Sequence, residues 1–115
     1  MTIRAAVRGV GHYLPDRVVP NAEFEKTLDT TDEWIRTRTG IERRHFAAPG
    51  QTTSDLAARA CRRALDSAGW QASEVDALVL ATSTADLTFP SAATMTQHAI
   101  GMTGGFAFDV QAVCA

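Results

Sequence analysis

The sequence lacks several features that would assign it to a protein class at once. Only two of its 115 residues are cysteines, and Cys61 and Cys114 lie far apart, with no Cys-x-x-Cys spacing and no Cys/His cluster at ligand spacing. A zinc site and a disulfide scaffold are therefore not indicated, and we expect no bound metal. Eleven basic against thirteen acidic residues give a net charge of −2, which provides no broad positive surface for a nucleic-acid backbone.

Long apolar runs are also missing. Arg4 and Arg8 interrupt the first apolar stretch, so the N-terminus does not resemble a signal peptide, and no later run is long enough to cross a bilayer. We therefore expect a cytoplasmic protein with neither a membrane nor a nucleic-acid partner. Repeats, low-complexity tracts and linkers are absent as well.

What is present is the composition of a soluble globular domain, with 45% hydrophobic and 21% charged residues. Apolar periodicity, caps and turn residues predict strands and helices in the order β-α-α-β-α-β-α-β, which indicates an α/β fold with helices packed on a largely parallel sheet. The strand at Val75–Thr82 is apolar and continuous after Asp76, and it is expected to be buried on both faces. The predicted strands are Ile3–Val10, Ile41–Ala47, Val75–Thr82 and Phe106–Val110, and the predicted helices are Asn21–Leu28, Thr31–Arg38, Ser54–Ala68 and Ser91–Ile100.

Two short motifs are interpreted from local chemistry. Gly9-Val-Gly11 has part of a dinucleotide-binding pattern, but the third glycine is missing and Pro15 stands where a helix should continue, so we reject that function. Thr30-Thr-Asp-Glu33 has the spacing of a capping box, with Thr30 as the expected N-cap of the second helix.

Cys114 lies beyond the carboxyl end of the last predicted strand, which is where ligands and chemistry gather in sheets of this type. A helix that begins at or just after Cys114 would favour its thiolate and so make it a nucleophile. The alternative is that Cys114 is a small apolar core residue. Cys61, on the apolar face of its helix, is interpreted as such a core residue.

Four stretches resemble one known family in the same order. "GVGHYLPDRVVPN", "DTTDEWIRTRTGIERRHFAAPGQTTSDLA", "FPSAAT" and "AFDVQAVCA" are similar to the N-terminal part of β-ketoacyl-acyl-carrier-protein synthase III, and together they cover most of the chain. The resemblance implies a thiolase-like layered α-β-α fold. It also implies that residues 1–115 are the N-terminal part of the first thiolase-like half, because the family's chains are about three times as long.

The same resemblance implies an activity and its partners. Cys114 matches the family's acyl-accepting nucleophile, and the enzyme would take an acyl group from a short acyl-CoA and condense it with malonyl-acyl carrier protein, in type II fatty acid synthesis. Coenzyme A esters are substrates, so no cofactor is expected. The family's catalytic histidine and asparagine belong to the part beyond Ala115. None of His12, His45 and His98 is assigned to that role.

Trp34 and Arg38 are four residues apart and so share one helix face, where an indole can stack on a purine and a guanidinium can pair with phosphate. This suits coenzyme A. The resemblance implies the same and adds Thr30, although its capping function is a sufficient explanation for that residue. The other arginines nearby, Arg36, Arg43 and Arg44, are interpreted as a solvated face or as contacts to the carrier protein.

Phe89 matches a family residue that reaches across the interface of a homodimer and closes the partner's acyl pocket. Simple packing before Pro90 is the alternative. Two alternatives also remain for the function: a related condensing enzyme of secondary metabolism, making a quinolone, a polyketide or a similar product, and an inactive fragment.

Overall fold

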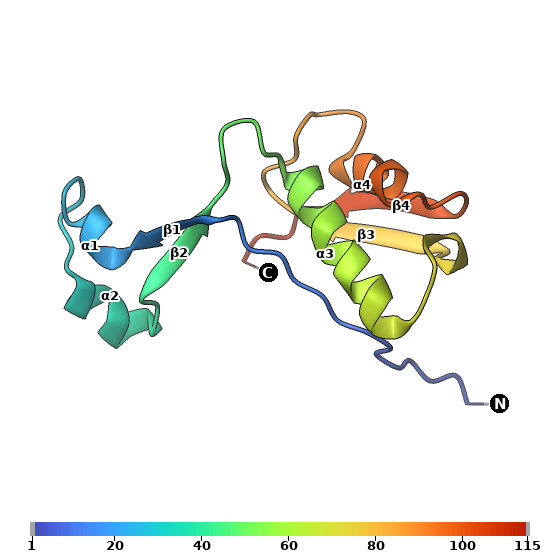
Figure 1. Cartoon of the computed structure of the whole chain (residues 1–115), viewed down its shortest axis with the longest axis horizontal. Coiled ribbons are helices and arrows are strands. Elements are labelled where there is room, and N and C mark those ends of the chain that lie inside the picture. The colour runs from blue at the N-terminus through green and yellow to red at the C-terminus, as the bar shows by residue number, and fades with distance from the viewer. Residues whose placement is uncertain (1, 115) are drawn as a thin grey trace. The chain divides into compact units, whose positions relative to one another are not determined.

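The computed structural model describes residues 2–114, which divide into two compact units. One unit is Leu14–Gly50, and the other joins the residues up to Tyr13 to those from Gln51 onwards. Figure 1 labels the helices and strands of both units.

The Leu14–Gly50 unit is an antiparallel pair of short strands with two helices inserted between them. Strand β1 (Arg17–Pro20) pairs with β2 (Arg43–Phe46), and Val19 lies opposite Arg44. The connecting helices are α1 (Asn21–Phe24) and α2 (Asp32–Thr39). Val19 and Ile35 supply the buried apolar side chains of this unit. The sequence did not predict β1, which has only four residues and ends in a proline.

The second unit is built on a parallel pair of strands. Strand β3 (Ala77–Ala81) and strand β4 (Phe106–Val110) are hydrogen-bonded in parallel, with Leu78 beside Ala107. Helix α4 (Ala92–Ile100) connects them and packs against both, which makes a β-α-β unit. The short 3₁₀ helix η1 (Ala72–Glu74) precedes β3.

Helix α3 (Thr53–Ala68) confirms the most regular of the predicted helices. Thr52 caps its first turn in a capping box with Asp55, and Gly69 ends it with φ at 68°. Its exposed face carries Arg59, Arg62 and Arg63, as the periodicity predicts. The apolar face packs against α4, and Cys61 contacts the core cluster formed by Leu78, Ala93 and Met102.

The predicted first strand, Ile3–Val10, is wrong. These residues form no strand in the structure, and the segment runs along α3 in an extended form (Figure 1). The Val10 amide donates to Ser67 Oγ at 3.4 Å, and Arg63 donates to the His12 carbonyl oxygen at 2.8 Å. A strand needs a neighbouring strand to satisfy its backbone groups, and none of the described residues provides one here.

One face of the β3–β4 pair carries the core, and the other is open. Leu78, Leu80 and Ala107 point to the helices, whereas Val79, Phe106 and Phe108 are exposed, with Phe106 and Phe108 stacked 6.0 Å apart. The expectation that Val75–Thr82 is buried on both faces is therefore wrong for the described residues. The α/β class itself is confirmed. No helix among the described residues is long and apolar enough to cross a membrane.

Candidate functional site

The carboxyl ends of β3 and β4 lie at the same edge of the sheet and form a cavity of about 560 Å³. Its lining comes from Ala81–Thr84 and Val110–Val113. Cys114 follows directly and is exposed to solvent. The structure therefore places Cys114 at the edge where the sequence predicts chemistry. Because its side chain is exposed, Cys114 is not part of the apolar core that residues 2–114 form. The predicted helix beginning at or after Cys114 lies outside the described residues.

Two carboxylates fix the elements around this edge. Asp109, near the end of β4, accepts from the Ala92 and Ala93 amides at 2.9 and 2.7 Å, in the first turn of α4. Asp86, after β3, accepts from the Ser54 amide at 2.9 Å and from its hydroxyl at 2.5 Å, at the beginning of α3. Both helices are thus tied by their first turns to the loops and strands that lead to Cys114.

Val113 has a left-handed backbone, with φ at 50°. This conformation is unfavourable for a β-branched residue, and such positions occur most often at functional sites. The strained residue lies immediately before Cys114. It is the only non-glycine residue with positive φ in the part of the chain that the structure describes.

Cys61 has the opposite surroundings. It is half-buried against the core, and burial raises the pKa of its thiol, an effect that the Arg62 charge only partly offsets. A raised pKa means less thiolate at neutral pH. The interpretation of Cys61 as a packing residue agrees with this environment.

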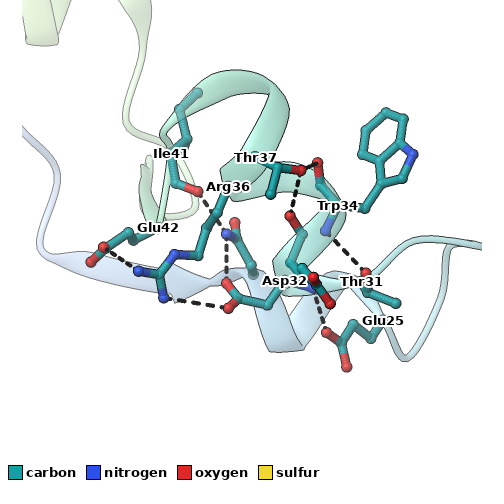
Figure 2. Close-up of polar contacts among 10 residues, drawn as sticks. Glu25, Thr31, Asp32, Trp34, Arg36, Thr37, Ile41 and Glu42 are labelled. Atoms are coloured by element: carbon teal, nitrogen blue, oxygen red, sulfur yellow. Dashed lines mark hydrogen bonds and ion pairs between the residues drawn. The ribbon is translucent and has the colours of Figure 1, made fainter.

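Trp34 and Arg38 meet on one face of α2, as their spacing predicts. The guanidinium carbon of Arg38 lies 4.4 Å from the centre of the Trp34 ring, and the indole is 52% exposed. In Figure 2 the indole points away from the polar contacts of the helix. Trp34 is therefore a surface aromatic residue, not part of the core.

The capping of α2 differs by one residue from the prediction. Thr31, not Thr30, is the N-cap, and its hydroxyl accepts from the Trp34 amide at 3.1 Å. The expected capping function of Thr30 is thus wrong, because the helix begins one residue later. The Thr30 hydroxyl is buried and has no hydrogen-bond partner among residues 2–114. A buried polar atom without a partner is costly, which favours a ligand that supplies one.

Trp34 and Thr30 line the same groove, which we call the aromatic groove. Its volume is about 520 Å³. The lining is mostly apolar, and the residues are Phe24, Leu28, Asp29, Thr30, Trp34, Ile35, Arg44 and Phe46. Such a groove, with aromatic walls and a few polar groups, is typical of a small-molecule site.

A network of charges holds α2 in place beside the groove (Figure 2). Arg36 forms ion pairs with Asp32 at 3.6 Å and with Glu42 at 3.0 Å. Glu25 accepts from the Asp32 amide at 2.7 Å. Arg36 therefore belongs to an internal network of this unit.

Arg44 is a charged groove residue that the sequence analysis did not identify as a binding residue. It was expected on a solvated face or in contact with the carrier protein, and the structure shows a half-buried side chain that lines the aromatic groove. Its place follows from the pairing of β2 with the distant β1, which no local signal in the sequence reveals.

The Phe89 ring is 82% exposed, and the Phe89–Pro90 peptide bond is cis. The ring therefore does not pack as an anchor before Pro90 among the described residues. A contact across a dimer interface remains a prediction.

No family profile matches the chain. Over all 115 residues the chain is 79% identical to a β-ketoacyl-[acyl-carrier-protein] synthase III of Cereibacter sphaeroides, and it spans 36% of that protein's length. The resemblance inferred from the sequence is thereby confirmed.

Solved structures agree. The crystal structure of 3-oxoacyl-[acyl-carrier-protein] synthase III from Aquifex aeolicus matches 93% of this chain with a TM-score of 0.86 at 42% identity, over 34% of its own length. The priming β-ketosynthase of the R1128 polyketide biosynthetic pathway matches 95% of this chain with a TM-score of 0.87 at 40% identity, over 33% of its length. The chain thus has the fold of the corresponding third of these enzymes.

Proposed function

We propose that the chain is part of an enzyme that begins fatty acid synthesis by condensation, because all 115 of its residues match β-ketoacyl-acyl-carrier-protein synthase III. The observation that carries the proposal is the match itself, since it includes Cys114 and the residues of the aromatic groove in one continuous alignment. The substrates would be a short acyl-CoA and malonyl-acyl carrier protein.

The first chemical step is an acyl transfer to Cys114. Its thiolate attacks the thioester carbonyl carbon, the new carbon–sulfur bond forms, and the bond to the coenzyme A sulfur breaks. Coenzyme A leaves as a thiolate and takes up a proton. In the second step malonyl-acyl carrier protein loses carbon dioxide, and the resulting carbanion attacks the Cys114 thioester. This returns the cysteine and releases the 3-oxoacyl product.

The aromatic groove suits the nucleotide end of acyl-CoA. The adenine would stack on Trp34, and Arg38, already placed over the indole, would lie beside the phosphates. The unpaired Thr30 hydroxyl could hydrogen-bond a polar group of the base. These three roles and the role of Phe89 at a homodimer interface are parts of the proposal.

Mass spectrometry tests the acyl transfer directly. After incubation of the full-length enzyme with acetyl-CoA, we expect one acetyl group, located on the peptide that contains Cys114. The Cys61→Ala variant is the matched control and should be acetylated to the same extent, whereas Cys114→Ala should not be acetylated. An acetyl group on Cys61, or on neither cysteine, contradicts the proposal.

A second candidate function has its own support. The match to the priming β-ketosynthase of a polyketide pathway is as good in TM-score and identity as the match to the fatty acid enzyme from Aquifex aeolicus. Such an enzyme would use the same nucleophile with a different primer. Comparing kcat/KM for acetyl-CoA and for longer acyl-CoA primers distinguishes the two, because a preference for long primers would favour the second candidate.

A further inference from the structure

We propose that Arg44 binds a phosphate group of the nucleotide in the aromatic groove and so selects a nucleotide-bearing acyl donor. This inference rests on the proposed function, since it names a further binding residue of the same groove. It comes from the position, the partners and the charge of Arg44.

The position of Arg44 is set by the strand pair. Arg44 on β2 lies opposite Val19, which is 1% exposed, so both side chains are on the inner face of the unit. There the Arg44 guanidinium lies over the Phe24 ring, 5.0 Å from its centre, and it lines the groove together with Trp34. The cation is thus held against an aromatic wall of the groove.

The partner of Arg44 is neutral. Its Nη1 donates to Asn21 Oδ1 at 3.2 Å, and no carboxylate within residues 2–114 forms an ion pair with it. Arg36 in the same unit has two carboxylate partners. A guanidinium has five N–H donors, so Arg44 keeps its charge and most of its donors for another group.

Asn21 gives this arrangement a fixed geometry. It is 1% exposed, and its Nδ2 donates to Asp32 Oδ1 at 2.9 Å and to the Ile41 carbonyl oxygen at 2.7 Å. Because both amide donors are used, Oδ1 must be the atom that faces Arg44. The guanidinium is therefore positioned before any ligand binds.

A phosphate fits this position better than other anions of the proposed substrate. The planar guanidinium binds two phosphate oxygens at once, and the adjacent aromatic residues accept a base. Asp29 is the one carboxylate among the described residues that line the groove, and its side chain is exposed, so the high dielectric constant of water weakens its repulsion of a bound phosphate. An acyl donor without a nucleotide would gain nothing from Arg44.

The test measures acyl transfer to the full-length enzyme from two donors, acetyl-CoA and the acetyl thioester of N-acetylcysteamine, which has no nucleotide. In Arg44→Gln we expect KM for acetyl-CoA to rise about 10- to 100-fold, the loss typical of a charge-assisted hydrogen-bond pair. The kcat/KM for the short thioester should stay unchanged. Arg44→Lys, which keeps the charge without the planar fork, should give an intermediate KM.

Lys26→Gln is the matched control, because it removes one exposed positive charge from the same unit and should leave both donors unaffected. The inference is overturned if Arg44→Gln leaves KM for acetyl-CoA unchanged, or if both donors lose activity equally, which would indicate a structural role. If Arg44→Gln does not fold, an unchanged KM in Arg44→Lys overturns it. An unsubstituted enzyme that accepts no acetyl group from acetyl-CoA instead contradicts the proposed function itself.

Discussion

At the scale of single residues, the two cysteines differ in their surroundings, and this difference predicts how each reacts. Cys114 is exposed at the edge of the sheet, whereas Cys61 is half-buried and the pKa of its thiol is raised by burial. Because the thiolate is the reactive form, Cys61 is disfavoured both by access and by ionisation.

We therefore expect iodoacetamide at neutral pH to alkylate Cys114 faster than Cys61, since Cys114 is exposed and the raised pKa of Cys61 leaves less of its thiol as thiolate. Peptide mapping of the full-length enzyme at increasing times measures both rates. Raising the pH should narrow the difference between the two alkylation rates, because a larger fraction of the Cys61 thiol is then ionised. Equal rates at neutral pH would show that the environment of Cys61 is more open than described.

Trp34 is a second residue whose exposure carries a prediction. Trp34→Ala removes the stacking surface and should weaken the binding of coenzyme A esters by about 1–3 kcal/mol, by analogy with the stacking of single-stranded bases. Acyl transfer at saturating substrate should be retained. Trp70→Ala removes an exposed tryptophan from the other unit and is the control. Calorimetric titration with coenzyme A measures both variants, and equal affinity would leave Trp34 as a surface residue without this role.

At the scale of the helices and strands, the outcome of the sequence analysis depends on how local the signals are. Helix α3 and strand β4 were predicted from periodicity and end signals within a few residues. The strand at Ile3–Val10 was wrong because a strand requires a partner elsewhere, and β1 was missed for the same reason. At the candidate site, the Trp34–Arg38 contact follows from helical spacing, but the position of Arg44 depends on the pairing of distant strands.

The contact of Asp86 with the first turn of α3 predicts a dependence of stability on pH. Burial acts to raise the pKa of Asp86, but hydrogen bonds from Ser54 and Thr52 outweigh it, and the pKa lies below its ordinary value of 3.8. A carboxyl group with a lowered pKa in the folded state stabilises the fold above its unfolded pKa and loses this effect as the pH falls through the folded value. Below about pH 4 the stabilisation should therefore decline.

Asp86→Asn should remove that part of the pH dependence. Thermal unfolding of the full-length enzyme from pH 7 to pH 3 should show a lower Tm for the variant at pH 7 and a difference that shrinks toward pH 3. Asp66→Asn, on the exposed face of α3, is a control that should change neither value. A constant difference at all pH values would mean that the ionisation of Asp86 does not stabilise the helix.

The contact of Asp109 with the first turn of α4 also predicts an effect on stability. Asp109→Ala removes two hydrogen bonds between a carboxylate and helix amides, and it should lower the free energy of unfolding by about 1–3 kcal/mol. Asp109→Asn keeps one acceptor and should lose less. Urea unfolding measures both, and a loss in Asp109→Asn equal to that in Asp109→Ala would show that the charge, not the hydrogen bonds, is responsible.

At the scale of the whole molecule, one face of the β3–β4 sheet is apolar and exposed to solvent among the described residues. Val79, Phe106 and Phe108 are between 44% and 58% exposed on one side of the parallel pair, and β3 and β4 are the only strands of their sheet among the described residues. Exposed apolar surface and open strand edges favour association with other chains.

We expect the 115-residue chain, produced alone, neither to catalyse condensation nor to behave as a stable monomer. Size-exclusion chromatography and a condensation assay test the two parts of this prediction. Phe108→Thr should increase the monomeric fraction of the isolated chain, because it makes the open face less apolar, whereas Lys26→Thr should not. A monodisperse, cooperatively unfolding and active chain would contradict both the site and the role of the open face.

The close contact between the N-terminal segment and α3 has a consequence for how substitutions in this protein are interpreted. A Cβ atom on Gly9 would lie 2.6 Å from the Ala64 carbonyl oxygen, and one on Gly11 would collide with the Ala64 and Ala60 backbone. Neighbouring Val7 and Val10 are largely exposed and can change freely. A mutational scan would therefore find two intolerant glycines, spaced as in a nucleotide-binding loop, within a tolerant surface segment. The cause of that pattern would be the close contact between the backbone of the N-terminal segment and the backbone of α3. Attributing the loss of function in Gly9 and Gly11 variants to lost ligand binding would therefore be a mistake.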